Sequence, residues 1–372
     1  MPPDLDPSPY RVTPETLWRP ETPPLPPRFA LDAAIHSDLE RIARADEQLR
    51  TVHLDALSAK RMLEETLSHN AYGTASIEGN PLTLEEVESL LARGPTPENL
   101  VVPDEREILN HAALMEDLDD LTPPRTPEDV RALHSRLFEG VLEDAGRFKD
   151  GQNFIGHGPT KRVVFVPTPP DRVEAELQTA LDWVHGDDAH PLVKAFVFFH
   201  EFQGIHPFRD GNGRTGRLVN TILLHHAGYP GVRYAFLDYA FNADREGYYG
   251  TLAEVEREHY DFTPWVRYMA RTLRRTMEEA VERYRLRDTL PPGLNDRQER
   301  LALWFARSAQ EHPGRRVALN DVHAVFPAIP ERTLRRDLGA LVEAGVLLRE
   351  GERKGTRYRL APQAETDRGD GA

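Results

Sequence analysis

Apolar residues recur at spacings of three and four along most of this chain, which is the period of an amphipathic helix. Between Arg28 and about His53 the apolar stripe consists of Leu31, Ile35, Leu39, Ile42 and Leu49. The period predicts further helices over residues 54–72, 83–93, 104–120, 126–139, 171–185, 191–205, 212–227, 243–258 and 262–288. Thr83 begins one of them in a capping box with Glu86. The chain is therefore predicted to be mainly α-helical.

The segment between Gly146 and Pro170 departs from the helical period. It contains several glycines and then a short run of β-branched and aromatic residues at 162–166. Such a run beside turn residues is typical of a strand. We expect a small β-hairpin over about residues 153–166.

A second pattern follows the linker Pro291-Pro292-Gly293. Helices are predicted over 297–310, 320–326 and 331–344, then two short strands around 346–348 and 358–360, joined by a charged turn. This order of elements is typical of a winged helix.

The whole chain is thus expected to have five parts. They are a Pro-rich extended arm (1–27), an N-terminal helical region (28–125), a helical core with the hairpin (126–290), a winged helix (291–361) and a disordered tail (362–372). The arm contains ten prolines, so we expect it to be poorly ordered and laid over the surface.

Composition narrows the possible functions. The 372 residues include no cysteine, which excludes disulfides and thiolate metal sites and agrees with a reducing cytoplasm. Neither a signal-peptide pattern nor an 18-residue apolar run is visible, so we expect no membrane segment. The net charge of −15 disfavours general binding to nucleic acid. Residues 329–360 nevertheless carry eight Arg or Lys against five Asp or Glu, a local excess of positive charge. DNA binding there and protein contact or dimerisation remain alternatives.

The most informative stretch runs from His206 to Arg217, with the sequence HPFRDGNGRTGR. A histidine that can act as a base is followed four residues later by an aspartate, and then by Gly-Asn-Gly before a predicted helix. Two glycines at a helix N-terminus let backbone N–H groups converge on an anion. Arg214 and Arg217 add charged donors for phosphate, and Asp210 is a natural Mg²⁺ ligand. Each feature has an ordinary structural explanation, but their combination favours a phosphate-handling site with a base.

This stretch resembles the signature of the Fic family, His-x-Phe-x-Asp/Glu-Gly-Asn-Gly-Arg-x-x-Arg, at every fixed position. The resemblance implies transfer of AMP from ATP to a Ser, Thr or Tyr hydroxyl of a protein. It gives His206 the role of general base and Asp210 that of the Mg²⁺ ligand. It implies catalytic roles for His206, Asp210, Asn212, Arg214 and Arg217. It implies nucleotide contacts for Phe208, Gly211, Asn212, Gly213, Arg214, Arg217 and Tyr249, with Phe208 also a buried anchor of the loop.

A second resemblance lies upstream. The residues from Thr74 to Gly79, TASIEG, are similar to the inhibitory motif Ser/Thr-x-x-x-Glu-Gly/Asn of the same family. This resemblance implies that Glu78 pairs with Arg217 and displaces the γ-phosphate. The alternative is that Glu78 only ends a helix.

The resemblance also implies a flap at the hairpin, which would hold a target protein by β-augmentation. The expected partners are ATP, an unknown target protein and the chain itself as target. DNA and a second copy are further candidate partners. Two other functions stay open: removal of AMP with Glu78 orienting a water, and a DNA-binding regulator that uses the Fic core as a nucleotide sensor. His200-Glu201 does not continue into a zinc motif, because position 204 is glycine.

Overall fold

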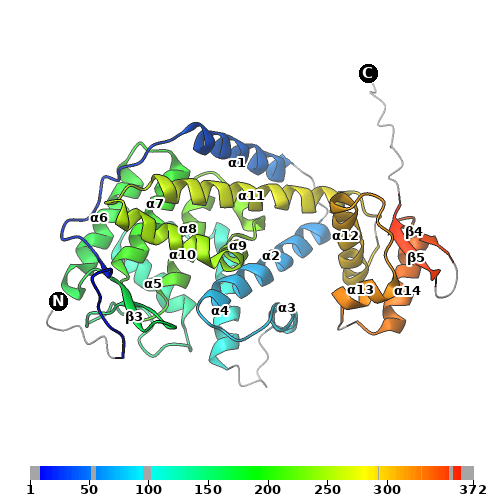
Figure 1. The fold of residues 1–372 in the computed structure, drawn as a ribbon, viewed down its shortest axis with the longest axis horizontal. Coiled ribbons are helices and arrows are strands. Elements are labelled where there is room, and N and C mark those ends of the chain that lie inside the picture. Colours follow the sequence, from blue (N-terminus) through cyan, green and yellow to red (C-terminus); the bar gives the residue numbers. More distant parts are fainter. Residues whose placement is uncertain are drawn as a thin grey trace. The chain divides into compact units, whose positions relative to one another are not determined.

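The computed structural model describes residues 9–51, 56–94, 102–291, 293–327, 329–351 and 355–361. The chain divides after Val281 into two compact units (Figure 1). The predicted disordered tail at 362–372 and the first eight residues of the predicted arm lie outside the described residues.

The first unit is built mainly from helices, which confirms the predicted fold class. They are α1 (Ala33–Thr51), α2 (Ala56–Ile77), α3 (Leu84–Arg93), α4 (Pro103–Glu116), α5 (Pro127–Leu137), α6 (Val173–Gly186), α7 (Pro191–Ile205), α8 (Asn212–His226), α9 (Leu237–Ala243), α10 (Arg245–Arg257) and α11 (Thr263–Asp288). Short 3-10 turns lie at Asp117–Asp119, Pro170–Arg172 and Pro230–Tyr234. The helix α9 was not predicted, because its seven residues are too few to show a clear period. No helix within the described ranges has the length and apolar character needed to cross a membrane.

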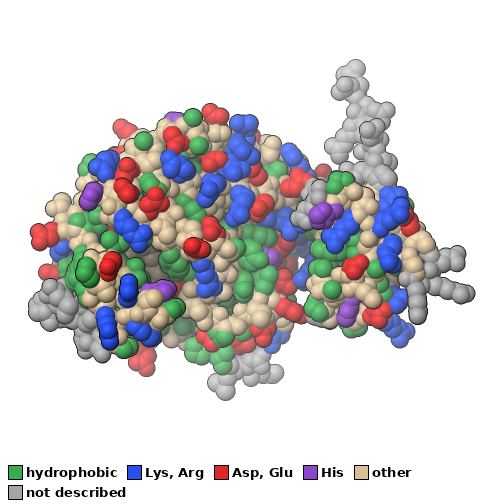
Figure 2. Space-filling model, viewed as in Figure 1, with side chains coloured by type: hydrophobic (Ala, Val, Ile, Leu, Met, Phe, Trp, Pro, Cys, Tyr) green, Lys and Arg blue, Asp and Glu red, His purple; other side chains and the backbone are tan. Residues whose placement is uncertain are grey.

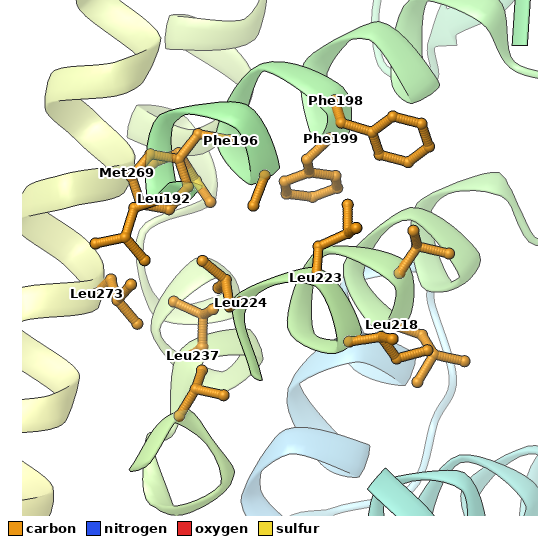
Figure 3. Close-up of a cluster of buried hydrophobic side chains, with 14 of the residues drawn as sticks. Leu192, Phe196, Phe198, Phe199, Leu218, Leu223, Leu224, Leu237, Met269 and Leu273 are labelled. Atoms are coloured by element: carbon orange, nitrogen blue, oxygen red, sulfur yellow. The ribbon is translucent and has the colours of Figure 1, made fainter. Parts of the chain in front are cut away.

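The centre of this unit is the pair α7 and α8, which are buried on nearly all sides. The side chain of Phe199 on α7 points toward Leu223 of α8 (Figure 3). Met269 and Leu273 of α11 belong to the same buried cluster. The indole Nε1 of Trp265 on α11 donates to the carbonyl of Phe196 at 2.7 Å. Because this packing fixes both helices, it also fixes the two ends of the loop 206–211 that joins them.

The surface of the unit carries charges of both signs on the face drawn in Figure 2. The helix α1 lies along α11 (Figure 1), where Arg274 forms an ion pair with Asp38 at 2.6 Å and Arg41 one with Glu278 at 2.7 Å. The second of these pairs is exposed, so it contributes at most about 1 kcal/mol.

The predicted end of α2 at Tyr72 is wrong. The helix continues through Gly73 to Ile77 and so carries the motif residue Thr74 on its last turns. The glycine is required by packing, because a Cβ at Gly73 would lie 2.5 Å from the backbone nitrogen of Tyr239 on α9. The absence of a side chain at Gly73 lets α9 approach α2 closely.

The predicted hairpin is present. The strands β2 (Ile155–His157) and β3 (Arg162–Val166) pair antiparallel. The N-terminal arm adds a third strand, β1 (Leu17–Trp18), which pairs parallel with β3 and gives the sheet order β1-β3-β2.

The described part of the arm, residues 9–27, is anchored, contrary to the expectation of poor order. Its Arg19 side chain is 1% exposed. The guanidinium donates to Glu201 on α7 at 3.1 and 2.7 Å and to Glu176 on α6 at 3.0 Å. A Cβ at Gly204 would lie 2.9 Å from its Nη1, which explains the glycine at the position where a zinc motif would need histidine.

The second unit contains α12 (Asp296–Glu311), α13 (Leu319–Val325), α14 (Glu331–Glu343) and the antiparallel strands β4 (Leu347–Glu350) and β5 (Arg357–Leu360). Its own core includes Leu301, Phe305, Leu334, Leu338 and Leu347. The order of elements is the predicted one; the assignment to the winged-helix class stays a prediction.

Candidate active site

The loop between α7 and α8 places His206 at the end of α7 in a left-handed conformation, with φ of 51°. Its amide donates to the carbonyl of Phe202 at 2.9 Å and so closes the helix. The ring Nδ1 lies 3.2 Å from the carbonyl of Gln203. Because a carbonyl only accepts hydrogen bonds, we assign the ring proton to Nδ1 and the free lone pair to Nε2.

Two effects keep His206 neutral. Burial, and then the positive charge of Lys149, lower the pKa of the imidazole to about 4. Burial also lowers the pKa of Lys149 itself, to about 7. At neutral pH the imidazole can therefore accept a proton, as a general base must.

Phe208 and Asn212 fix the shape of the loop. The amide of Phe208 donates to Oδ1 of Asn212 at 2.8 Å, and Nδ2 of Asn212 donates back to the carbonyl of Phe208 at 2.8 Å. The Phe208 ring is fully buried and stacks on His134 with centroids 3.7 Å apart. The Phe208 side chain therefore packs inside the protein; its predicted nucleotide contact stays a prediction.

Gly211 turns the chain into α8 with a φ of 78°. A side chain there would overlap the ring of Phe138. The turn leaves the first backbone N–H groups of α8, from Asn212 onward, without intrahelical partners. Together with the positive end of the helix dipole, these donors form a candidate anion site.

Asp210 and Arg214 lie beside this anion site. Oδ1 of Asp210 accepts from the amide of Gly211 at 2.6 Å and from Arg214 Nη2 at 2.8 Å. The Arg214 guanidinium also pairs with Glu107 at 2.9 Å and lies over the Phe138 ring at 4.6 Å. These contacts fix the buried Arg214 guanidinium beside Asp210.

The Asp210 carboxylate could hold Mg²⁺ only together with substrate phosphates that complete the coordination. The Asp210 side chain is 61% exposed. Within the described ranges no group of three or more His, Cys, Asp or Glu residues forms a metal cage. Magnesium is commonly bound by one or two carboxylates together with substrate phosphates and water. Asp210 has the chemistry and the exposure for that arrangement.

Arg217 is fully buried and bound to the end of α2. Its Nη2 forms an ion pair with Glu78 Oε1 at 2.7 Å, and its Nε donates to Thr74 Oγ1 at 2.8 Å. Burial acts to lower the pKa of Arg217, but the charge of Glu78 raises it above the ordinary value. The spacing of four residues puts Thr74 and Glu78 one turn apart, so that both reach the same guanidinium.

The carboxylate of Glu78 also contacts the first turn of α8. A Cβ at Gly213 would overlap Glu78 Oε1, and it would lie 3.2 Å from Arg217 Nη1. The end of α2 is held by Arg245, whose Nη2 donates to the carbonyl of Ser76 at 2.8 Å. Glu78 therefore places a negative group at the N-terminus of α8, where the anion site lies.

The paired tyrosines of α10 have different environments. Tyr248 is buried against Phe241 and Trp265, with ring centroids 5.1 and 6.0 Å away. Tyr249 is 47% exposed. Of the two, Tyr249 is the one whose ring is open to a ligand.

Sequence reasoning missed several residues of the site. Glu107 on α4 pairs with Arg214, and His134 on α5 stacks on Phe208. Lys149, before the hairpin, acts on His206 through its charge. They lie 57 to 99 positions before His206 in the chain, and no motif marked them. Their roles follow only from the fold.

Residues 124–224 match the model of the Fic/DOC family. The chain therefore contains a region that matches the Fic/DOC family, and it is similar to a solved Fic family protein. A Fic family protein from Desulfovibrio desulfuricans G20 has a crystal structure with a TM-score of 0.62 and 27% identity, covering 91% of this chain and 99% of that one. A segment of Fic-1 from Caenorhabditis elegans has a TM-score of 0.55 at 22% identity, covering 68% of this chain and 73% of that one, and shows the fold.

Relatives of known name are found among animals. "Protein adenylyltransferase Fic" of Nematostella vectensis is 27% identical over 252 residues, which are 64% of this chain and 55% of that protein. The protein of the same name from Aedes aegypti is 28% identical over 254 residues, covering 65% of this chain and 48% of the relative. The chain spans about half the length of these relatives.

Proposed function

We propose that this protein transfers AMP from ATP to a Ser, Thr or Tyr hydroxyl of a protein, with Mg²⁺, and that Glu78 restrains the reaction. The observation that carries the proposal is the placement of a neutral histidine and an anion site at the two ends of one short, rigid loop. The names of the relatives support the same activity.

In the proposed reaction the target hydroxyl oxygen attacks the α-phosphorus of ATP. The bond from phosphorus to the bridging oxygen breaks, and pyrophosphate leaves. Nε2 of His206 takes the hydroxyl proton. The first N–H groups of α8, with Arg214, stabilise the charge that develops on the phosphate oxygens, which is commonly the largest catalytic contribution. Mg²⁺ at Asp210 would neutralise phosphate charge when bound.

The proposed restraint rests on the position of one carboxylate. Glu78 occupies Arg217 and contacts the α8 terminus, where the outer phosphates of ATP would bind. A phosphate and a carboxylate cannot share this space, since both are negative and both need the same donors. Glu78 would therefore lower productive binding of ATP.

The reaction is tested by label transfer to the protein itself or to added proteins. Glu78→Gly with [α-³²P]ATP and Mg²⁺ should label protein, and the same variant with [γ-³²P]ATP should not, because pyrophosphate is released. The control Glu78→Gly/His206→Ala should not be labelled. Transfer of the γ label would identify phosphoryl transfer instead, and absence of either label in a folded variant would favour the nucleotide-sensor function.

A second function is proposed for the C-terminal unit, namely DNA binding through α14. Arg332, Arg335 and Arg336 are exposed at spacings of three and four on this helix, so they share one face. Arg335 and Arg336 have acidic neighbours at Glu331 and Asp337, which weaken the positive field. A duplex-DNA shift that weakens with salt and is lost in Arg332→Ala/Arg336→Ala would support the proposal; a salt-insensitive or absent shift would refute it.

A further inference from the structure

Lys149 is a buried cation for which the structure shows no ion pair. The residue is only 3% exposed. No carboxylate among the described residues lies within ion-pair distance of its Nζ; Glu176 on α6 is the acidic group that acts on it from further away. A buried ammonium without a paired charge is costly, so a lysine at such a position calls for a functional explanation.

The hydrogen bonds of Lys149 lead to the loop that carries His206. Its Nζ donates to the carbonyl of Ile205 at 3.3 Å, and its backbone amide donates to the carbonyl of Pro207 at 2.9 Å. One side chain and its own backbone thus bond to the residues on either side of the histidine. The left-handed turn at His206 is held from both sides.

The same ammonium binds the segment that leads into the hairpin. Nζ of Lys149 donates to Oδ1 of Asn153 at 2.8 Å, and Nδ2 of Asn153 donates to the carbonyl of Phe208 at 3.0 Å. Lys149 and Asn153 therefore form a bridge between the residues before β2 and the loop 205–208. We call this pair the Lys149–Asn153 bridge.

We propose that Lys149 is a positioning residue for the catalytic base. Through the Lys149–Asn153 bridge it fixes the His206 loop to the hairpin, and its charge favours the unprotonated imidazole. Only the predicted effect of Lys149 on the reaction rate rests on the proposed AMP transfer.

The charges around His206 make the electrostatic part testable. Lys149 lies on one side, while Glu78 at the end of α2 and Asp210 in the loop act in the opposite direction. Removal of the lysine charge leaves the two carboxylates unopposed. The imidazole should then bind a proton more readily.

The first measurement is the pKa of His206 by NMR in the full chain, comparing wild type with Lys149→Met. We expect the pKa to rise by about one pH unit. The matched control is Lys194→Met, because Lys194 Nζ also donates to a backbone carbonyl, that of Asp187 at 2.8 Å, but at the other end of α7. It should leave the His206 pKa unchanged. This readout needs no AMP transfer, so it separates failure of the inference from failure of the proposed function.

The second measurement is kinetic, in the Glu78→Gly background. Lys149→Met should lower kcat about tenfold or more and leave KM for ATP within about twofold. The fall of kcat on the acid side of its pH profile should move to higher pH. Lys149→Arg keeps the charge and should restore part of the rate. Asn153→Leu should lower kcat without changing the His206 pKa. If Lys149→Met does not fold, Lys149→Gln gives the same comparison. An unchanged His206 pKa in a folded, uncharged variant would overturn the proposal.

Discussion

Arg19 is the strongest predicted determinant of stability outside the active site. It is the buried cation that two buried carboxylates share, Glu176 and Glu201. Burial acts to raise the pKa of Glu201, but Arg19, with a further contribution from His200, lowers it to about 2. Arg19→Met removes the charge and keeps most of the volume, so it isolates the electrostatic contribution.

The loss of stability in Arg19→Met follows from the two buried carboxylates that remain without their cation. Removing one partner of a buried ion pair typically costs about 3–5 kcal/mol. The lowered pKa of Glu201 gives an upper figure of about 3 kcal/mol at pH 7 for Arg19 and His200 together, since the ordinary pKa is 4.5. Because the pKa of Glu201 is lower in the folded protein than in the unfolded chain, the ionised carboxylate stabilises the fold fully above pH 4.5. This stabilisation is lost as the pH falls through about 2. In Arg19→Met, Glu201 can take up a proton instead, so the penalty should shrink toward acid pH.

The assay is urea unfolding followed by tryptophan fluorescence at pH 7 and pH 5, with Arg41→Met as the matched control. Arg41 also pairs with a carboxylate through two hydrogen bonds, but at the surface. We expect a loss of about 3–5 kcal/mol for Arg19→Met at pH 7, a smaller loss at pH 5, and at most about 1 kcal/mol for Arg41→Met. A loss below about 1 kcal/mol for Arg19→Met at pH 7 would refute the reasoning.

Three further predictions concern the site and its supports. Thr74→Val removes an acceptor from the buried Arg217 side chain and should raise basal AMP transfer, though less than loss of the inhibitory carboxylate; a rate at or below that of wild type would contradict this. Gly211→Ala should lower the free energy of unfolding by about 2–4 kcal/mol, because φ is 78° and the added Cβ would overlap the ring of Phe138. The control Gly151→Ala, with no atom near its Cβ, should change this free energy little. Equal effects of the two substitutions in urea unfolding would contradict the prediction. Burial lowers the pKa of His134 to about 4, so the unfolded chain takes up a proton at this residue at a higher pH than the folded protein does. This difference should lower the free energy of unfolding of wild type by up to about 3 kcal/mol between pH 6.5 and pH 4. The stability advantage of wild type over His134→Gln should therefore narrow across that range, and a constant difference in urea unfolding would show that His134 does not titrate as stated.

The helices, the hairpin and the central motif were predictable because their signals are local. Leu31 to Leu49 repeat with a helical period, and the residues from His206 to Arg217 lie next to one another in the chain. The missing parts depend on distant contacts. Gly73 looks like a helix breaker until α9 is seen to pack on it, and Arg19 lies in a Pro-rich arm with no periodic pattern. Lys149 has no motif at all, and its burial depends on the fold of the hairpin segment.

The central claim is that the Glu78 carboxylate restrains AMP transfer by holding Arg217. The most direct test compares initial rates of AMP transfer for wild type and Glu78→Gly, with Glu85→Gly as a control for glycine at an exposed glutamate. A charged hydrogen bond of this kind contributes about 1.5–3 kcal/mol, so we predict a rise of about tenfold or more for Glu78→Gly and none for Glu85→Gly. Equal rates for wild type and a folded Glu78→Gly would contradict the account.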